Sequence, residues 1–283
     1  RGMNIKSKRL LHILLILLTS AVISVIAGIS EWIILHETDI STLMGSLEVY
    51  EYLFFMGTIS AELVFIISLI TLSYYLAGIK PAELGFKRTK SVVLLFTIAA
   101  GILAPFIGLI INLAAGTAEI ISINANLYPI GLSILFYLLI AFYEELLFRG
   151  FIITGLKEIA GTNSSLIISS ALFTAAHAMN PNLTIAAYAN IFIAGWFLGV
   201  LFLRTGSIAA PFVFHFLWNT TMGLLLGFNV SGFSHESIVN LKLTGTELMN
   251  GGLAGFEGSL PCTIILISLI FYSNKKINKI IEK

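Results

Sequence analysis

Long apolar runs alternate with short polar segments along almost the whole chain. A transmembrane helix needs about 20 consecutive, mainly apolar residues. Eight runs follow this pattern, and the helices they predict lie at about 10–29, 52–77, 91–115, 127–153, 165–179, 183–203, 208–228 and 259–273. The sequence therefore predicts an all-α polytopic membrane protein, in which about eight transmembrane helices form a single integral membrane domain over residues 1–283.

The charges between the runs predict the orientation of this bundle. Short cytoplasmic loops collect Lys and Arg, and of the 16 Lys and Arg residues only Lys242 falls in a loop on the other side. The opposite loops carry acids, among them Glu37 and Asp39. We therefore expect both termini to be cytoplasmic, and the chain to be a multi-pass protein of the cell (cytoplasmic) membrane.

The composition supports this class and excludes others. The chain is 57% hydrophobic and 11% charged with a mean hydropathy of +0.96, whereas soluble domains carry about 25% charged residues. The formal net charge of +1 gives no indication of a nucleic-acid partner. The single cysteine, Cys262, excludes an intrachain disulfide and a cysteine-rich zinc site.

Three ionisable residues interrupt the fourth apolar run. Glu144, Glu145 and Arg149 lie within six residues of one another, and such groups on a membrane helix cost about 2.5 to 3.5 kcal/mol each on insertion scales, so they are functional by default. Glu145 and Arg149 are four residues apart on one helix face, which predicts an ion pair that positions the helix. Glu144 points about 100° away from Glu145 and is the candidate reactive group.

Polar residues with helical spacing recur on two further runs. Phe173 and His177 are four apart on the fifth run, and His215 and Asn219 are four apart on the seventh. A lone histidine on a membrane helix more often bridges helices through a hydrogen bond. Two histidines, an asparagine and the unpaired Glu144 on three helices favour a catalytic site instead.

Two other groups are interpreted without a catalytic role. Glu62 stands alone on the second run and is interpreted as a protonated or hydrogen-bonded packing residue. The pair His235 and Glu236 lacks the second histidine of a helical zinc-protease motif, and is interpreted as part of a solvated loop. The predicted catalytic core therefore covers only about 127–228.

The residues of this core support two kinds of hydrolysis. A desolvated Glu144 can act with His177 as a base that activates water. His215 and Asn219 can then donate N–H groups to an oxyanion. No serine or cysteine is placed beside the base, so direct attack by water is the simpler peptidase mechanism.

A catalytic zinc site is the alternative, with Glu144, His177 and His215 as its three ligands. The sequence does not separate the two mechanisms. We favour the metal-free one, because Glu144 would otherwise be both ligand and base with no second free carboxylate.

The motifs Glu-Glu-x-x-x-Arg at 144–149, Phe-x-x-x-His at 173–177 and His-x-x-x-Asn at 215–219 resemble, in order, those of the CAAX-protease and bacteriocin-processing (Abi) family. This family of intramembrane peptidases includes the type II CAAX prenyl endopeptidases. The resemblance is strong from about 127 to 228, and segments 80–86 and 243–258 look like those of prokaryotic members.

The resemblance implies an eight-span helical core with a cavity reached from the cytoplasm. In that cavity Glu144 and His177 would activate water. His215 and Asn219 would hold the oxyanion. The implied partners are membrane lipid and a peptide or protein substrate, with or without a prenyl group.

Two functions from other classes stay open. A proton-coupled transporter would also place Glu and His inside the membrane, although such proteins more often contain repeats and broken helices. A non-catalytic bacteriocin-immunity or scaffold protein could keep the same fold without hydrolysis, but would usually have lost part of the motif set.

Overall fold

The computed structural model of the chain describes residues 10–19, 22–23, 25–26, 47–124 and 128–281. The first predicted span is represented there by the apolar helix Leu10–Thr19. The end of that span, most of the outer loop predicted after it and the basic N-terminal residues lie outside the described residues.

Helices make up most of the described chain. The longer ones are α3 (Leu47–Ala77), α4 (Ser91–Ala114), α5 (Tyr128–Glu145), α7 (Thr162–Ala176), α8 (Ile185–Thr205), α9 (Ala209–Asn219) and α11 (Leu260–Ile281). The short ones are α6 (Thr154–Ala160), α10 (Glu247–Asn250) and the 3-10 turns Gly252–Ala254 and Phe256–Gly258. Each predicted run from the second to the eighth therefore contains a helix.

Four stretches among the described residues are long and apolar enough to cross a membrane. They are Ile59–Ala77, Ser91–Ala114, Ile130–Ala160 and Ile185–Thr205. Helices α7 and α9 have only 15 and 11 residues, fewer than the about 20 that a full crossing requires. The eight spans and the cytoplasmic termini thus remain predictions.

A small sheet that was not predicted accompanies the helices. Strands β1 (Ala118–Ile123) and β2 (Val239–Leu243) form a two-stranded antiparallel sheet, in which Ala118 pairs with Leu243 and Ile123 with Val239. The register shifts between Ile120 and Ser122. The partners are far apart in the sequence, so no local pattern of the chain announces the pairing.

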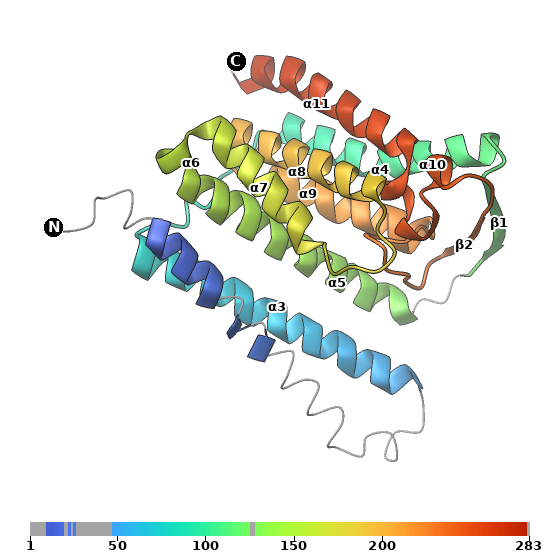
Figure 1. Ribbon diagram of the computed structural model, residues 1–283, viewed down its shortest axis with the longest axis horizontal. Helices are drawn as coiled ribbons and strands as arrows, with labels where there is room; N and C mark the ends of the chain where they lie inside the picture. The colour runs from blue at the N-terminus through green and yellow to red at the C-terminus, as the bar shows by residue number, and fades with distance from the viewer. Residues whose placement is uncertain (1–9, 20–21, 24, 27–46, 125–127, 282–283) are drawn as a thin grey trace.

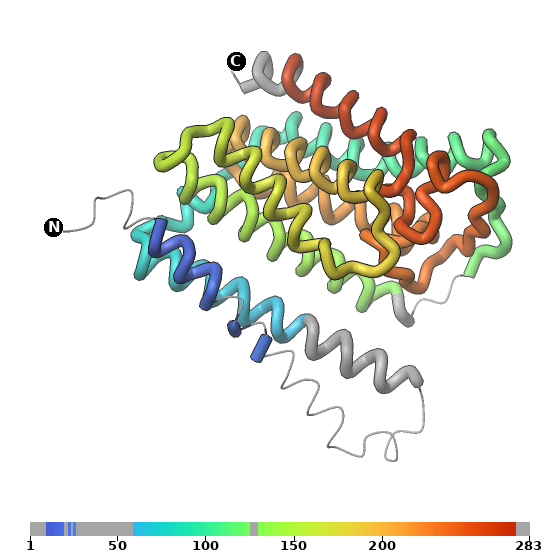
Figure 2. The backbone as a smooth tube through the Cα atoms, in the orientation of Figure 1, coloured from blue at the N-terminus to red at the C-terminus, as the bar shows by residue number. Residues whose placement is uncertain are grey.

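The elements of the bundle gather at two opposite ends (Figure 1). The sheet, α10 and the loops 177–184 and 226–238 lie at one, which we name the sheet end. The loop 78–90, α6 and the C-terminal ends of α8 and α11 lie at the other, which we name the basic end. The chain passes back and forth between these ends (Figure 2).

The loop 78–90 is fixed to the basic end by hydrogen bonds to its backbone carbonyls. The Thr154 hydroxyl donates to the Glu83 carbonyl at 3.1 Å, and the Ser207 hydroxyl donates to the Lys87 carbonyl at 2.7 Å. At Gly150, any Cβ atom would lie 2.7 Å from the Leu84 carbonyl oxygen, so the absence of a side chain permits this approach.

Two helices change their hydrogen-bonding pattern beside the predicted motifs. The chain leaves α5 after Glu145 and continues as a π-helix, Leu146–Ile153, before α6. It leaves α9 after Asn219 and continues as a second π-helix, Thr220–Leu225. The fourth helical run is therefore continuous to Ala160, seven residues beyond its predicted end at 153. Short π segments inside helices are frequent at functional sites.

Helix α4 packs along α9, and a glycine on α4 allows the two backbones to approach closely. A Cβ atom on Gly101 would lie 2.9 Å from the Phe214 carbonyl oxygen and 3.0 Å from Cβ of Leu217. Small residues allow this kind of close backbone approach between membrane helices. Since α9 carries His215 and Asn219, the contact also locates the predicted site.

We expect Gly101→Val to destabilise the protein. The added side chain must push α4 away from the α9 backbone, and overpacking of this kind costs about 1 to 3 kcal/mol. The apparent Tm in detergent should fall, and peptidase activity should fall with it. Gly131→Ala on α5 is the matched control, because its Cβ would meet nothing within 4 Å. Equal Tm values for the two variants would contradict the packing role.

Candidate active site

One cavity brings the four predicted catalytic side chains together. It has a volume of about 320 Å³. Glu144 reaches it from α5, and His177 reaches it from the end of α7. His215 and Asn219 reach it from α9. All three motifs thus contribute to the wall of a single space inside the bundle.

Glu145 connects two of the motifs through one carboxylate oxygen. Its Oε1 accepts a hydrogen bond from Nη1 of Arg149 at 2.7 Å, which confirms the predicted ion pair. The same Oε1 lies 2.9 Å from Nδ1 of His215. The second contact was not predicted, and it means that Glu145 orients the His215 ring as well as pairing with Arg149.

Arg149 is fully buried and contacts two further helices. Its Nη2 donates to the Gly195 carbonyl of α8 at 3.1 Å, and its guanidinium lies 4.4 Å from the centre of the Phe173 ring of α7. A guanidinium over an aromatic face is a favourable cation–π arrangement. Arg149 therefore joins α8 and α7 to the segment that carries Glu145.

Phe173 lies beside both histidines. Its ring centre is 4.8 Å from that of His177 and 6.0 Å from that of His215. Next to it, Gly195 lies ten residues from either end of α8, so the cluster sits near the middle of the bundle. Helix α7 ends there at Ala176, and His177 follows as its C-terminal cap rather than inside a longer span.

The hydrogen bonds of the two imidazoles fix which nitrogen faces the cavity. Nδ1 of His177 lies 2.8 Å from the Phe173 carbonyl, which can only accept, so Nδ1 carries the proton and Nε2 holds a lone pair. Nδ1 of His215 likewise donates to the Glu145 carboxylate. In each ring, Nε2 is therefore the nitrogen that can take part in proton transfer.

The closest contact of Glu144 differs from the predicted one. Its Oε2 lies 3.6 Å from Nε2 of His215, beyond hydrogen-bond distance, although the sequence suggested His177 as its partner. Both histidines line the cavity with Glu144, so all three side chains face the same space. The side chain of Glu144 is 13% exposed.

Two residues that were predicted to have no catalytic role also line this cavity. Glu62 reaches it from α3, and His235 reaches it from the loop before β2. His235 packs against the rings of Phe136 and Tyr137 at 5.9 and 5.5 Å, so the solvated-loop interpretation is wrong for it. Burial lowers the pKa of His235. For Glu62, its position as a lone acid in an apolar run was the sequence feature that could have indicated a place in the site. No sequence feature indicated this for His235.

Hydrogen bonds join three loops over the cavity at the sheet end. The Asn180 amide donates to the Ser231 carbonyl at 3.0 Å, and the Ser231 backbone N–H donates to the Glu257 carboxylate at 2.8 Å. Ser231 has a φ of 47°, which the bonds on both sides of it stabilise. These hydrogen bonds therefore stabilise the loops that form the rim of the cavity.

The three predicted zinc ligands, Glu144, His177 and His215, all line the cavity, and metal binding by them is not tested by this arrangement. Among the described residues, no three His, Cys, Asp or Glu side chains are grouped so that they could hold a metal ion. Glu62 provides a second carboxylate that was not predicted to line the site. With a second carboxylate in the cavity, Glu144 need not be both ligand and base, so the metal-free mechanism stays a prediction.

We expect Arg149→Ala to lower stability as well as activity. Removing one partner of a buried ion pair costs about 3 to 5 kcal/mol, because the survivor stays buried without compensation. Thermal unfolding in detergent measures the loss. Lys157→Ala, which removes an exposed cation of α6, is the control. If Arg149→Ala unfolds like the parent while Glu144→Gln loses stability, the structural and reactive roles are exchanged.

Comparison with known proteins gives one match. Residues 126–221 match a family model described as type II CAAX prenyl endopeptidase Rce1-like, and this segment contains all three motifs. No curated protein and no solved structure matches the chain. The match points to a protease, and the four apolar helices make it a membrane protein. Residues 126–221 of the chain are therefore similar to the Rce1-like type II CAAX prenyl endopeptidases.

Proposed function

We propose that the protein is an intramembrane endopeptidase that hydrolyses peptide bonds of membrane-associated substrates with a water activated by Glu144. The observation that carries this proposal is the shared cavity, into which Glu144, His177 and His215 all project. The family match supports peptidase chemistry in general.

The reaction begins with removal of a proton from water. Glu144 accepts this proton, with Nε2 of His177 as a second acceptor, while the water oxygen forms a bond to the scissile carbonyl carbon. The tetrahedral intermediate then collapses, and its C–N bond breaks. The proton held by Glu144 or His177 passes to the leaving amine, so the residues return to their starting state.

Hydrogen-bond donors must stabilise the negative charge that develops on the former carbonyl oxygen. The Asn219 amide supplies one N–H. His215 supplies another through Nε2 only when its ring is doubly protonated, since its Nδ1 proton is bound to Glu145. Fixed donors of this kind stabilise an oxyanion strongly in a site that excludes water.

The wall of the cavity fits a substrate held partly in the membrane. Phe136, Ile140, Val230 and Phe233 present apolar side chains around the polar catalytic groups. Such a surface accommodates an apolar peptide segment or a lipid anchor, and the polar groups select the peptide bond. A prenyl group is thus compatible with the cavity, but the proposal does not require one.

We expect Glu144→Gln, His177→Ala and His215→Ala each to abolish cleavage while leaving the fold intact. Asn219→Ala should retain a remnant, since loss of one oxyanion donor typically lowers kcat by about 10² to 10³. The assay uses one peptide sequence with and without a prenyl group, in detergent. Glu236→Gln, an exposed acid outside the catalytic cavity, is the control. Parental kcat/KM in Glu144→Gln would reject Glu144 as the base.

We expect the active enzyme to need no stoichiometric metal. Elemental analysis of purified, active protein should find well below one zinc per chain, and chelation should leave kcat/KM unchanged. A contrary result has a clear signature: one equivalent of zinc, lost on chelation together with activity and restored by adding zinc back. That outcome would make Glu144, His177 and His215 ligands.

A further inference from the structure

Residues 230–233 form a tight turn in the wall of the catalytic cavity. The N–H groups of Val230 and Phe233 each donate to the carbonyl of the other residue at 3.0 Å. Between them, Ser231 and Gly232 have φ values of 47° and 86°. Turns with positive φ at both central residues normally use glycine, asparagine or aspartate, so the serine needs support from outside the turn.

The carboxylate of Glu257 provides this support. Its Oε2 accepts a hydrogen bond from the Ser231 N–H at 2.8 Å and another from the Ser231 hydroxyl at 3.0 Å. Hydrogen bonds to a charged acceptor are stronger than those between neutral groups. Glu257 is itself fixed, because its backbone carbonyl accepts from the Asn190 amide of α8 at 2.7 Å and the preceding Phe256 is wholly buried.

The other side of the turn contacts the loop 177–184, which follows α7. The Asn180 amide donates to the Ser231 carbonyl at 3.0 Å, and the Asn182 amide donates to the Gly232 carbonyl at 3.1 Å. A Cβ atom on Gly232 would collide with a backbone carbonyl of this loop. The turn and the loop therefore lie directly against each other.

His177 depends on this loop for its position, because it caps α7 and does not lie inside a longer helix. Its carbonyl accepts a hydrogen bond from the Asn180 N–H at 3.0 Å. Hydrogen bonds thus link Glu257 to Ser231, Ser231 to Asn180 and Asn180 to His177. A small cavity of about 20 Å³, lined by Glu257, His177 and the catalytic residues of α9, lies between the two ends of this series.

We propose that Glu257 is a positioning residue of the active site, which holds the 230–233 turn and, through it, His177 in the geometry that catalysis requires. This proposal rests on the peptidase function proposed above and adds a residue to that site. Glu257 acts through the backbone of Ser231 and the side chain of Asn180.

Glu257→Ala tests the proposal in the assay that uses one peptide with and without a prenyl group. We expect kcat to fall at least tenfold, because the turn relaxes and His177 loses its orientation. KM should change less than threefold, since the part of the cavity wall on α5 does not depend on the turn. Glu257→Gln should lie between Glu257→Ala and the parent, because its amide oxygen can still accept from the Ser231 N–H.

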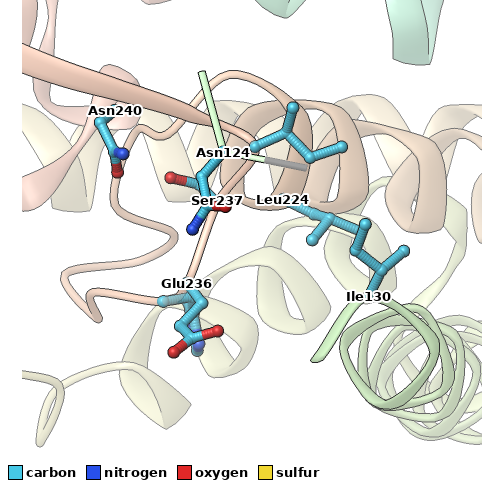
Figure 3. A pocket seen from close by; sticks show the side chains of 8 residues that line it. Asn124, Ile130, Leu224, Glu236, Ser237 and Asn240 are labelled. Atoms are coloured by element: carbon cyan, nitrogen blue, oxygen red, sulfur yellow. The ribbon is translucent and has the colours of Figure 1, made fainter. Parts of the chain in front are cut away.

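Glu236 provides the matched control. It is an exposed acid of the loop 226–238, and with Asn124 and Ser237 it lines a second pocket of about 200 Å³ and not the catalytic cavity (Figure 3). Glu236→Gln removes the same charge as Glu257→Gln from a nearby position, and should keep the parental kcat. An equal fall in both variants, or a fall of less than tenfold in Glu257→Ala, overturns the proposal.

Ser231→Gly separates positioning from a general loss of stability. Glycine adopts a positive φ without strain, so Ser231→Gly combined with Glu257→Ala should have a kcat at least threefold above that of Glu257→Ala. Asn180→Ala should lower kcat as well, and adding Glu257→Ala to it should cost less than the product of the two single effects, because both residues act on one series of contacts. No recovery, or fully multiplicative effects, would contradict the proposal.

NMR of ¹⁵N-labelled histidines in detergent measures the same positioning without turnover. The Nδ1 proton of His177 is bound to the Phe173 carbonyl, and its signal is assigned by its loss in His177→Ala. Glu257→Ala should shift this signal, whereas Glu236→Gln should leave it in place. An unshifted signal rejects the positioning role. An inactive parent in which Glu257→Ala still shifts the signal would reject the peptidase proposal alone.

Discussion

A single carboxylate oxygen, Oε1 of Glu145, holds the centre of this molecule together. It accepts from Arg149 on its own helical segment and from His215 on α9, and Arg149 in turn binds a carbonyl of α8 and lies on a ring of α7. A buried charge is tolerated only where its partners and hydrogen bonds are in place. Four helices are therefore held to one arrangement, and the adjacent Glu144 is directed into the cavity as a consequence.

Irregular backbone surrounds this buried pair. Helix α7 ends at Ala176 in the middle of the bundle, and π-helices begin immediately after Glu145 and after Asn219. Inside a bilayer, backbone that departs from an α-helix is tolerated only where protein buries it or where it lines a cavity. The end of α7 and the two π-helices therefore occur beside the cavity, and the catalytic residues lie where the helices cease to be regular.

The sequence predicted the local relations at the site well. Residues four apart share a helix face, so the ion pair of Glu145 and Arg149 and the adjacency of Phe173 and His177 could be read directly. The sequence could not predict which helices would face one another. The contact between Glu145 and His215, for example, joins positions 70 residues apart. Periodicity gives the face of a helix but not the partner of that face.

The remaining surprises have the same origin. Glu62, His235 and the paired strands β1 and β2 all depend on segments far apart in the chain coming together. The end of α7 was misjudged because Ala178 and Met179 continue an apolar run, while tertiary contacts decide where the helix stops. The approximate positions of the helices in the second to the eighth run, in contrast, follow from hydropathy.

The attachment of the loop 78–90 also has a consequence for the order in which the protein assembles. Its carbonyls at Glu83, Gly85 and Lys87 accept hydrogen bonds from Thr154, Ile208 and Ser207. All three donors are synthesised later than the loop, at about 5 to 20 residues per second. The loop can therefore make its contact with Thr154 first, and completes its attachment only after Ser207 and Ile208 have been synthesised.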